Sequence, residues 1–308
     1  MVDRPECTVG STLISASLPV ALFVVMLGLG LSLTVEDFRR VGRHSRAVVI
    51  ALVCQLVLLP VICFGLVLAF GLPAALAVGM MLVAASPGGP TANLYSHLFG
   101  GHVALNVTLT AVNTALIVVT LPIVVNLSAA YFLPDGAALG LQFGKVFQVF
   151  LMVLVPVAIG MLVRARVPGV ADRLNRPVRV LSVVVLVAVI SLVVYAERAN
   201  IADHVVAVGA AAVTFNVISL LIGYGAPRLA GVEHRAAIAS GFEIGVHNTT
   251  IAVTVALSPA LLNNAEMAIP GAVYGILMHF AAFGFGFLLT RRRVLQAVSG
   301  GPAAVEPG

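Results

Sequence analysis

The chain has 308 residues, of which 60% are hydrophobic and only 9% are charged. About a quarter of the residues in a soluble domain are charged, so this composition excludes a soluble fold and predicts that lipid surrounds most of the chain. The net charge of +5 and the pI near 9.6 do not indicate nucleic-acid binding, because the basic loops carry no interleaved aromatic residues.

The long apolar runs predict an all-α integral membrane protein. In hydrocarbon every backbone N–H and C=O group needs an internal partner, so a spanning segment is either a helix or part of a closed barrel. The runs are continuous and lack the alternation of barrel strands. About 20 apolar residues cross a bilayer core, and on this measure nine spans are predicted. They cover residues 12–34, 46–70, 74–99, 102–132, 139–163, 178–196, 202–226, 235–261 and 266–290.

The first span follows a short N-terminal segment, residues 1–11, which is predicted to lie outside the cytoplasm. The apolar stretch of this span is too long for a signal peptide, and basic residues follow it rather than precede it, so we expect a permanent span. The second span carries Gln55 together with Cys54 and Cys63. No cysteine pair has metal-ligand spacing, which favours small buried hydrophobic side chains over a metal site or a disulfide.

The third span is interrupted by the run Ser86-Pro87-Gly88-Gly89-Pro90-Thr91-Ala92-Asn93. Proline removes a backbone donor, and glycine adopts φ values that other residues avoid, so a continuous helix is not expected through this run. The fourth span, which follows directly, carries Asn106 and Thr110 in an otherwise apolar sequence.

The eighth span contains a second polar interruption, Gly241 to Thr250, with the sequence GFEIGVHNTT. It includes Glu243, the only acidic side chain that we predict inside the membrane. The ninth span carries His279. After it, residues 291–308 are rich in Gly, Ala and Pro and are predicted to form a disordered cytoplasmic tail.

The basic residues indicate the orientation of the chain. Lys and Arg collect in cytoplasmic loops, and with nine spans and an external N-terminus, 14 of the 17 Lys and Arg fall in such loops. The pattern predicts a multi-pass protein of the cell inner (plasma) membrane, with the N-terminus outside and the C-terminus in the cytoplasm. The 14 residues are Arg39, Arg40, Arg43, Arg46, Arg164, Arg166, Arg173, Arg176, Arg179, Arg228, Arg235 and Arg291 to Arg293.

The two interruptions occupy matching positions. Each lies in the next-to-last span of its half of the chain, residues 12–132 and 139–290, and the two spans run in opposite directions. We therefore predict two inverted repeats, of four and five spans, whose broken third and eighth spans cross at mid-membrane. Paired interruptions of this kind point to a transporter binding site. The alternative is a pair of proline kinks that neighbouring helices tolerate.

These residues carry a resemblance to a known family. The segment from Met26 to Phe38, the Pro87-Gly88-Gly89 run and the pattern Glu243-x-Gly245-x-His247-Asn248 resemble the bile acid:sodium symporter family. Gln55 and the segment from Val103 to Thr110 extend the similarity to nearly the whole chain. Many members of this family have ten helices, and the resemblance implies that the first of these has no counterpart here.

The resemblance implies one or two sodium ions bound between the breaks. One site would use Asn93, Thr110 and Glu243, with the positions of Ala92 and Asn106. The other would use Gln55, Glu243 and His247, with backbone carbonyls of Ile244 and Val246. This sequence departs from the family pattern at three positions, where Ala92 and Asn106 stand in place of serine and His247 in place of glutamine. Imidazole is a poor sodium ligand and titrates near neutral pH, so partial coupling to protons is a further hypothesis.

The breaks also favour an anionic substrate. A helix N-terminus presents unpaired N–H groups and the positive end of its dipole, so half-helices that start at the breaks suit an organic anion. The candidate substrate contacts are Asn248, His279, Thr91 and Pro90. For His279, an interhelical hydrogen bond is the alternative.

We therefore expect a secondary active transporter that imports a small organic anion by alternating access, coupled to sodium. No phosphate-binding loop is present in the sequence, which argues against ATP drive. An inorganic-anion efflux carrier of related architecture is one alternative, although such carriers use a cysteine in the broken helix. An intramembrane enzyme is a weaker alternative because no nucleophile accompanies Glu243 and His247, and a receptor or channel fits the paired breaks less well.

Overall fold

The computed structural model describes residues 23–39 except 25 and 29, residue 42, and residues 45–133, 143–174, 177, 178, 180, 181, 184, 201–258 and 261–298. In these parts of the chain the secondary structure is helical, as predicted. The elements are α2 (Val35–Arg39), α3 (Ser45–Val53), the π-helix η2 (Cys54–Leu58), α4 (Leu59–Ala69), α5 (Ala74–Ala85), α6 (Pro90–Leu98), α7 (Val103–Phe132), α8 (Phe143–Arg166), α10 (Ile201–Leu229), α11 (His234–Gly245), α12 (Thr249–Leu257), η3 (Glu266–Ala268) and α13 (Ile269–Val298).

Three of the described helices are long and apolar enough to cross a membrane: Ser45–Ala69, Val205–Leu229 and Glu266–Thr290. A fourth is α7, if its two parts, bent by 56°, form one span. The bend has a local cause, because Pro122 lies inside this helix and a proline ring clashes with the carbonyl four residues before it. The chain is therefore a multi-pass membrane protein, whereas the count of nine spans and the inverted repeats stay predictions.

Large apolar side chains face outward along these helices. Val61, Leu127, Val206 and Phe280 are 63%, 67%, 77% and 73% exposed, respectively. In water such a surface is a liability, but in hydrocarbon it costs nothing. The polar side chains of the same helices are instead buried, since Gln55, Asn106, Asn113 and Asn216 are all 2% exposed or less. The polar side chains of these spans therefore face the interior of the bundle rather than the lipid.

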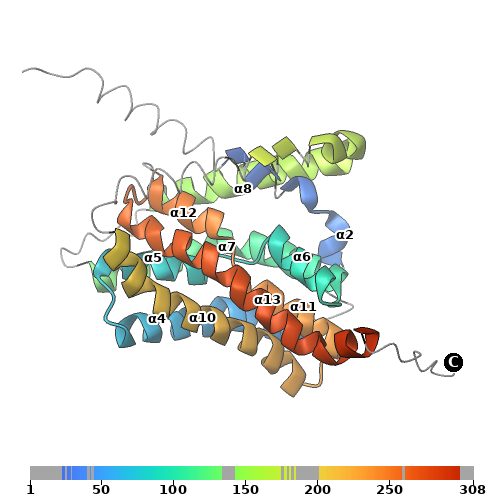
Figure 1. Cartoon of the computed structure of the whole chain (residues 1–308). Coiled ribbons are helices and arrows are strands. Elements are labelled where there is room, and N and C mark those ends of the chain that lie inside the picture. The colour runs from blue at the N-terminus through green and yellow to red at the C-terminus, as the bar shows by residue number, and fades with distance from the viewer. Residues whose placement is uncertain are drawn as a thin grey trace, which may run out of the picture.

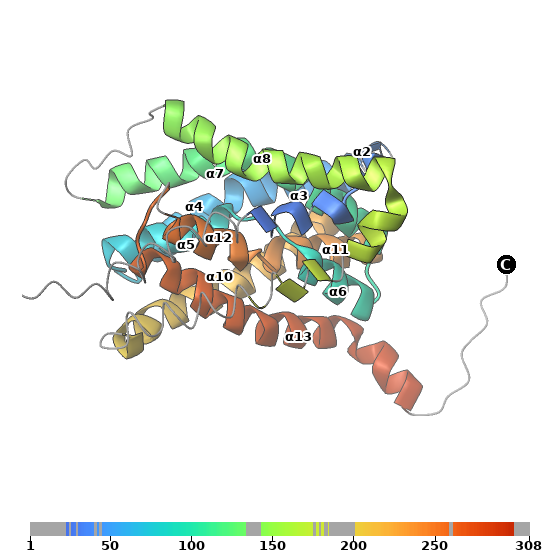
Figure 2. The same ribbon diagram turned by 90° about the horizontal axis from the view of Figure 1, so that it is seen from above.

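Both predicted breaks are present. The third span divides into α5 and α6, and the eighth divides into α11 and α12. Figure 1 shows α5 and α12 toward one end of the bundle and α6 and α11 toward the other, so the two broken spans run in opposite directions. Helix α7 packs against α5, α6 and α11, while α10 packs against α11 and α13. Seen from above, α8 and α13 lie along opposite edges of the bundle (Figure 2).

The C-terminal ends of α8 and α10 and the start of α11, all of which carry basic residues, lie toward the same end of the bundle (Figure 1). Helix α8 ends at Arg166, α10 ends next to Arg228, and α11 begins beside Arg235. The turn between α6 and α7 joins this end, because Arg235 Nε donates to the carbonyl of Gly100 over 3.2 Å. This grouping is consistent with the predicted orientation.

The end of α4 is formed by a glycine. At the end of α4, Gly71 has φ of 61°, and Leu72 N–H donates to the carbonyl of Val67 over 3.1 Å, which is the usual glycine-terminated helix end. Helix α13 continues to Val298, so it includes the first part of the segment predicted to be a disordered tail. The N-terminal segment 1–11, most of the span predicted at 178–196 and the tail from residue 299 lie outside the described residues.

Candidate cation and substrate site

The two breaks meet each other. Gly88 and His247 form an isolated antiparallel bridge, and the backbone N–H of Asn248 donates to the carbonyl of Pro87 over 2.7 Å. These bonds join two segments that lie in different halves of the sequence. The unwound backbone of each break thus satisfies part of its hydrogen-bonding requirement with the other, which makes irregular backbone tolerable inside a membrane protein.

Glycine at position 88 is required by the close approach of Glu243. A Cβ atom built on Gly88 would lie 2.5 Å from both the carboxyl carbon and the backbone oxygen of Glu243, closer than side chains in proteins approach. The neighbouring Gly89 has more room, since its Cβ would lie 3.4 Å from Asn248 Nδ2. The first break therefore lies directly against the carboxylate of the second.

Glu243 is fully buried and is held by α7. The Thr110 hydroxyl donates to Glu243 Oε2 over 2.6 Å, and Asn113 Nδ2 donates to Glu243 Oε1 over 3.2 Å. Among the described residues, no basic side chain forms an ion pair with this carboxylate. Placing an ionised acid without a partner at bilayer depth costs about 3 kcal/mol or more of free energy. A bound cation is the partner that would offset this cost for the Glu243 carboxylate.

Several amide oxygens near the breaks have no hydrogen-bond partner. They are Gln55 Oε1, Asn93 Oδ1, Asn106 Oδ1 and Asn113 Oδ1, all buried. A buried acceptor that lacks a donor costs free energy and requires an explanation, such as an ion. Sodium is a hard cation that prefers oxygen ligands, so these atoms and the Glu243 carboxylate fit it chemically. In the described part of the chain, no three His, Cys, Asp or Glu side chains cluster, which is the arrangement that a softer metal would require.

The structure brings together part of the first predicted sodium site. Thr110 and Glu243 are hydrogen bonded, and the Thr110 oxygen lies 3.1 Å from the carbonyl of Asn106. Asn106 Nδ2 donates to the carbonyl of Ala239 over 2.6 Å, which fixes the amide between α7 and α11. Asn93 lies in the first turn of α6, immediately after the break. No hydrogen bond joins Asn93 directly to these residues.

The second predicted site is assembled differently. Gln55 Nε2 donates to the carbonyls of Ala84 and Ser86, over 3.3 and 3.2 Å, so this side chain reaches the first break. Gln55 lies in the π-helix η2, a local irregularity that occurs often at functional sites. The side chain of His247 instead contacts α13, because its Nδ1 lies 2.9 Å from the hydroxyl of Tyr274. Ile244 and Val246 are buried.

Three polar residues of this region were not predicted from the sequence: Asn113, Asn216 and Tyr274. Asn113 lies three residues after Thr110 on the same helix, so helical periodicity would have placed both on one face. Asn216 is an amide in an apolar span, and such residues usually face a protein interior. No feature of the sequence around Tyr274 distinguishes it from an ordinary aromatic residue of a span.

The predicted substrate contacts divide into two groups. Asn248 and Thr91 are partly exposed and Pro90 is exposed, all of them at the starts of the half-helices α12 and α6. Neither helix has a side-chain cap at its N-terminus. His279 instead lies on α13 and its Nδ1 is 3.1 Å from the hydroxyl of Tyr95 on α6. The interhelical hydrogen bond considered for His279 is therefore present, and its contact with a substrate stays a prediction.

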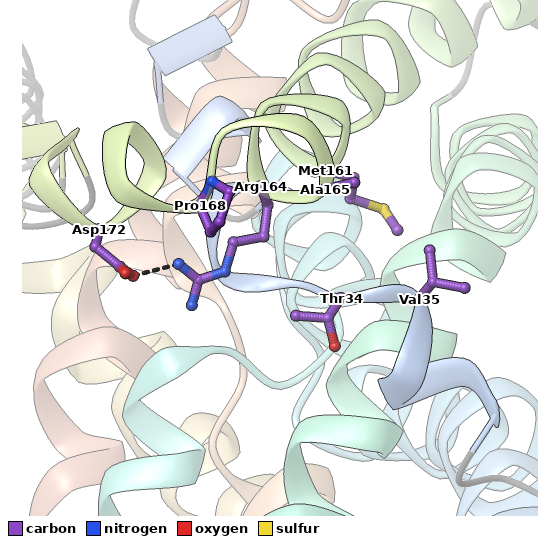
Figure 3. Close-up of a pocket in the computed structure, with 7 residues that line it drawn as sticks. All are labelled: Thr34, Val35, Met161, Arg164, Ala165, Pro168 and Asp172. Carbon is purple, nitrogen blue, oxygen red and sulfur yellow. Dashed lines mark hydrogen bonds and ion pairs between the residues drawn. The ribbon is translucent and has the colours of Figure 1, made fainter.

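Two cavities lie away from the crossing point. One, of about 440 Å³, lies between the end of α8 and the start of α2, where Arg164 pairs with Asp172 and faces Thr34 and Val35 (Figure 3). The other, of about 80 Å³, lies between α7 and α8, and its lining includes Thr114. Neither break contributes to these linings. Cys54 and Cys63, the two described cysteines, lie in η2 and α4 and not in a break.

Comparison with known proteins gives one consistent result. The model of the Sodium Bile acid symporter family matches residues 19–204. The chain is 29% identical over 265 residues to the uncharacterized sodium-dependent transporter YocS of Bacillus subtilis, covering 86% of this chain and 80% of that protein. It is 24% identical over 289 residues to the human ileal sodium/bile acid cotransporter, covering 92% and 81%. For the probable chloroplastic sodium/metabolite cotransporter BASS2 of rice, identity is 26% over 265 residues, covering 84% and 60%.

Proposed function

The chain belongs to the Sodium Bile acid symporter family, and we propose that it imports a small organic anion together with sodium by alternating access. The family and the matched relatives are sodium-dependent transporters, so the chain is a transporter and not an enzyme. The observation that carries the finer proposal is the position of Glu243, a fully buried acid at the contact between two unwound segments.

The cation occupies the space beside Glu243. Thr110, Asn93 and Asn106 supply oxygens around it, and the unpartnered amide oxygens of Asn93 and Asn106 support this assignment. A cation there neutralises the acid and supplies the missing partners at the same time. Because the carboxylate lies against Gly88, binding the cation also fixes the first break against the second. This coupling is how sodium organises the substrate site.

The anion binds at the N-termini of α6 and α12. Both half-helices start at the crossing point and have nine residues each, enough for the terminal N–H groups and dipole to attract a negative charge. Asn248, Thr91 and Pro90 border this position. A carboxylate or a similar oxyanion therefore suits the site better than a cation or a neutral sugar, and the apolar interior suits a partly apolar body.

The transport cycle moves one group of helices past another around the crossed breaks. The proposed framework has two inverted repeats within nine spans, in the inner membrane, with the N-terminus outside and the C-terminus in the cytoplasm. The grouping of basic helix ends at one end of the bundle supports this orientation.

The test is uptake of a panel of labelled organic anions into liposomes that contain the purified chain. A sodium gradient is applied with no proton gradient, and then the reverse. We expect uptake of at least one anion under the sodium gradient and its loss in Glu243→Gln, with Glu266→Gln, an acid outside the breaks, as the matched control. Sodium-driven uptake that persists in Glu243→Gln would contradict the proposal. Proton-driven uptake that is lost in His247→Gln would indicate partial coupling to protons.

A further inference from the structure

A second polar cluster lies behind the eighth-span break, and two of its members, Asn216 and Tyr274, have no role in the proposed function. Asn216 Nδ2 donates to the carbonyl of Gly245 over 2.6 Å and to the hydroxyl of Tyr274 over 2.7 Å. That hydroxyl also lies 2.9 Å from the Gly245 carbonyl and 2.9 Å from His247 Nδ1. We call Asn216, Tyr274 and His247 the α10–α13 cluster, since it ties the break to these two helices.

The α10–α13 cluster is buried and closely packed. Asn216 and Tyr274 are 0% exposed and His247 is 2% exposed, and the ring of Phe215 covers the imidazole with 5.5 Å between ring centroids. Gly245 is the last residue of α11, so its carbonyl has no partner within the helix. The cluster supplies that partner twice. It therefore holds the end of α11 in one position without an ion.

The position of His247 has a consequence for cation binding. Its remaining ring atom, Nε2, is buried and has no hydrogen-bond partner, so the side chain offers a nitrogen and not an oxygen. A second sodium site at this place would rely on Gln55 Oε1, backbone carbonyls and a share of Glu243. Both oxygens of Glu243 already accept hydrogen bonds from α7, which directs the carboxylate toward the first site.

The charge balance around Glu243 also favours a single bound cation. Glu243 is the only buried acid in the described parts of the two broken spans, so it balances one monovalent cation. Before the anion binds, a second cation beside it would leave a net positive charge in a region of low dielectric, which is costly unless a full set of oxygen ligands surrounds that ion. A neutral hydrogen-bonded cluster carries no such cost.

We propose that the α10–α13 cluster takes the place of a second sodium ion, so that this chain binds a single sodium ion, on the α7 side of Glu243. Asn216 and Tyr274 are positioning residues that hold the Gly245 carbonyl and the His247 ring. This inference rests on the proposed sodium-coupled function. It replaces the range of one or two ions by one, and it assigns a role to two residues that were not predicted from the sequence.

The experiment counts bound sodium on the purified full chain in detergent. Equilibrium binding of radioactive sodium gives the number of ions per chain. The slope of Tm against the logarithm of sodium concentration is a second readout, because it is proportional to that number when the enthalpy of unfolding is unchanged. We expect one ion per wild-type chain and a Hill coefficient of 1. In the double variant His247→Gln/Tyr274→Phe, an amide replaces the imidazole, and no tyrosine hydroxyl remains to bind that amide. We expect this variant to bind two sodium ions and to double the slope of Tm against the logarithm of sodium concentration.

A matched control is available because Tyr224 and His234 form a similar pair elsewhere, with the hydroxyl 3.0 Å from His234 Nδ1. The variant His234→Gln/Tyr224→Phe is expected to bind one ion. Two ions per wild-type chain would overturn the inference and leave the sodium-coupled function intact, whereas no bound sodium would remove both. A double variant of His247 and Tyr274 that elutes as a single folded species and still binds one ion would also overturn it. The wild-type count does not depend on the folding of any variant.

Discussion

Gly88 is the position where a single methyl group is expected to separate sodium binding from folding. In Gly88→Ala the added Cβ would meet the carboxyl carbon and the backbone oxygen of Glu243 at 2.5 Å. Neither atom has room to retreat, because the carboxylate is held by Thr110 and Asn113 and the backbone oxygen belongs to a packed helix. The breaks must therefore move apart, or the carboxylate must leave its donors.

The magnitude follows from the cost of overpacking. Inserting a methyl group into a well-packed interior costs about 1–3 kcal/mol. If this strain is relieved by displacing Glu243 from the cation position, sodium affinity falls by a factor of roughly 5 to 150. The expected result is a half-saturating sodium concentration raised within this range, with a smaller effect on the fold of the helices.

The assay is the sodium dependence of Tm for the purified chain, repeated for sodium-driven uptake. Gly89→Ala is the matched control, because Gly89 has extended backbone with φ of −145° and its Cβ would lie 3.4 Å from Asn248 Nδ2, an ordinary contact. We expect Gly89→Ala to bind sodium as the wild type does. If Gly88→Ala retains wild-type sodium affinity while folded, the close contact between the first break and Glu243 is not what forms the cation site.

Three further predictions concern side chains of the same region. Glu243→Gln is expected to raise Tm in sodium-free buffer, because it removes an unbalanced buried charge, and to abolish the rise of Tm with sodium; a preserved sodium response would contradict this. Asn113→Ala removes a donor to the carboxylate and is expected to lower the free energy of unfolding by about 1–3 kcal/mol, measured by denaturant or heat, whereas Thr120→Val, which lies on the same helix and bonds only within it, is expected to have little effect. Tyr95→Phe breaks the 3.1 Å contact with His279 and is expected to cost about 1 kcal/mol of stability with sodium affinity unchanged; a large loss of sodium affinity would show that this pair reaches the cation site.

The backbone chemistry of the two breaks explains why their positions could be predicted from the sequence. The Pro87-Gly88-Gly89 run disrupts a helix because proline lacks a backbone donor, and both this run and the polar segment around Glu243 contain glycines, which favour a helix less than other residues do. Such effects do not depend on the rest of the fold. The structure ends one helix at Ala85, directly before the first predicted interruption, and another at Gly245, inside the second.

The residues that contact the substrate were harder to predict from the sequence. His279 was considered both as a substrate contact and as an interhelical hydrogen-bond partner, and its hydrogen bond to Tyr95 joins residues 184 positions apart. A polar residue within a span indicates an inward-facing side chain. It does not indicate which of several neighbouring helices that side chain will meet.

By itself, the sequence determined the solvent of this protein, the helical class and the positions of the two interruptions, because apolar length and the backbone chemistry of proline and glycine act over a few residues. Tertiary packing alone decided that Asn113 binds Glu243, 130 residues away, and that Asn216 and Tyr274, 58 residues apart, hold the end of α11. Contacts between helices depend on how whole helices are placed, and no local pattern of residues encodes that placement.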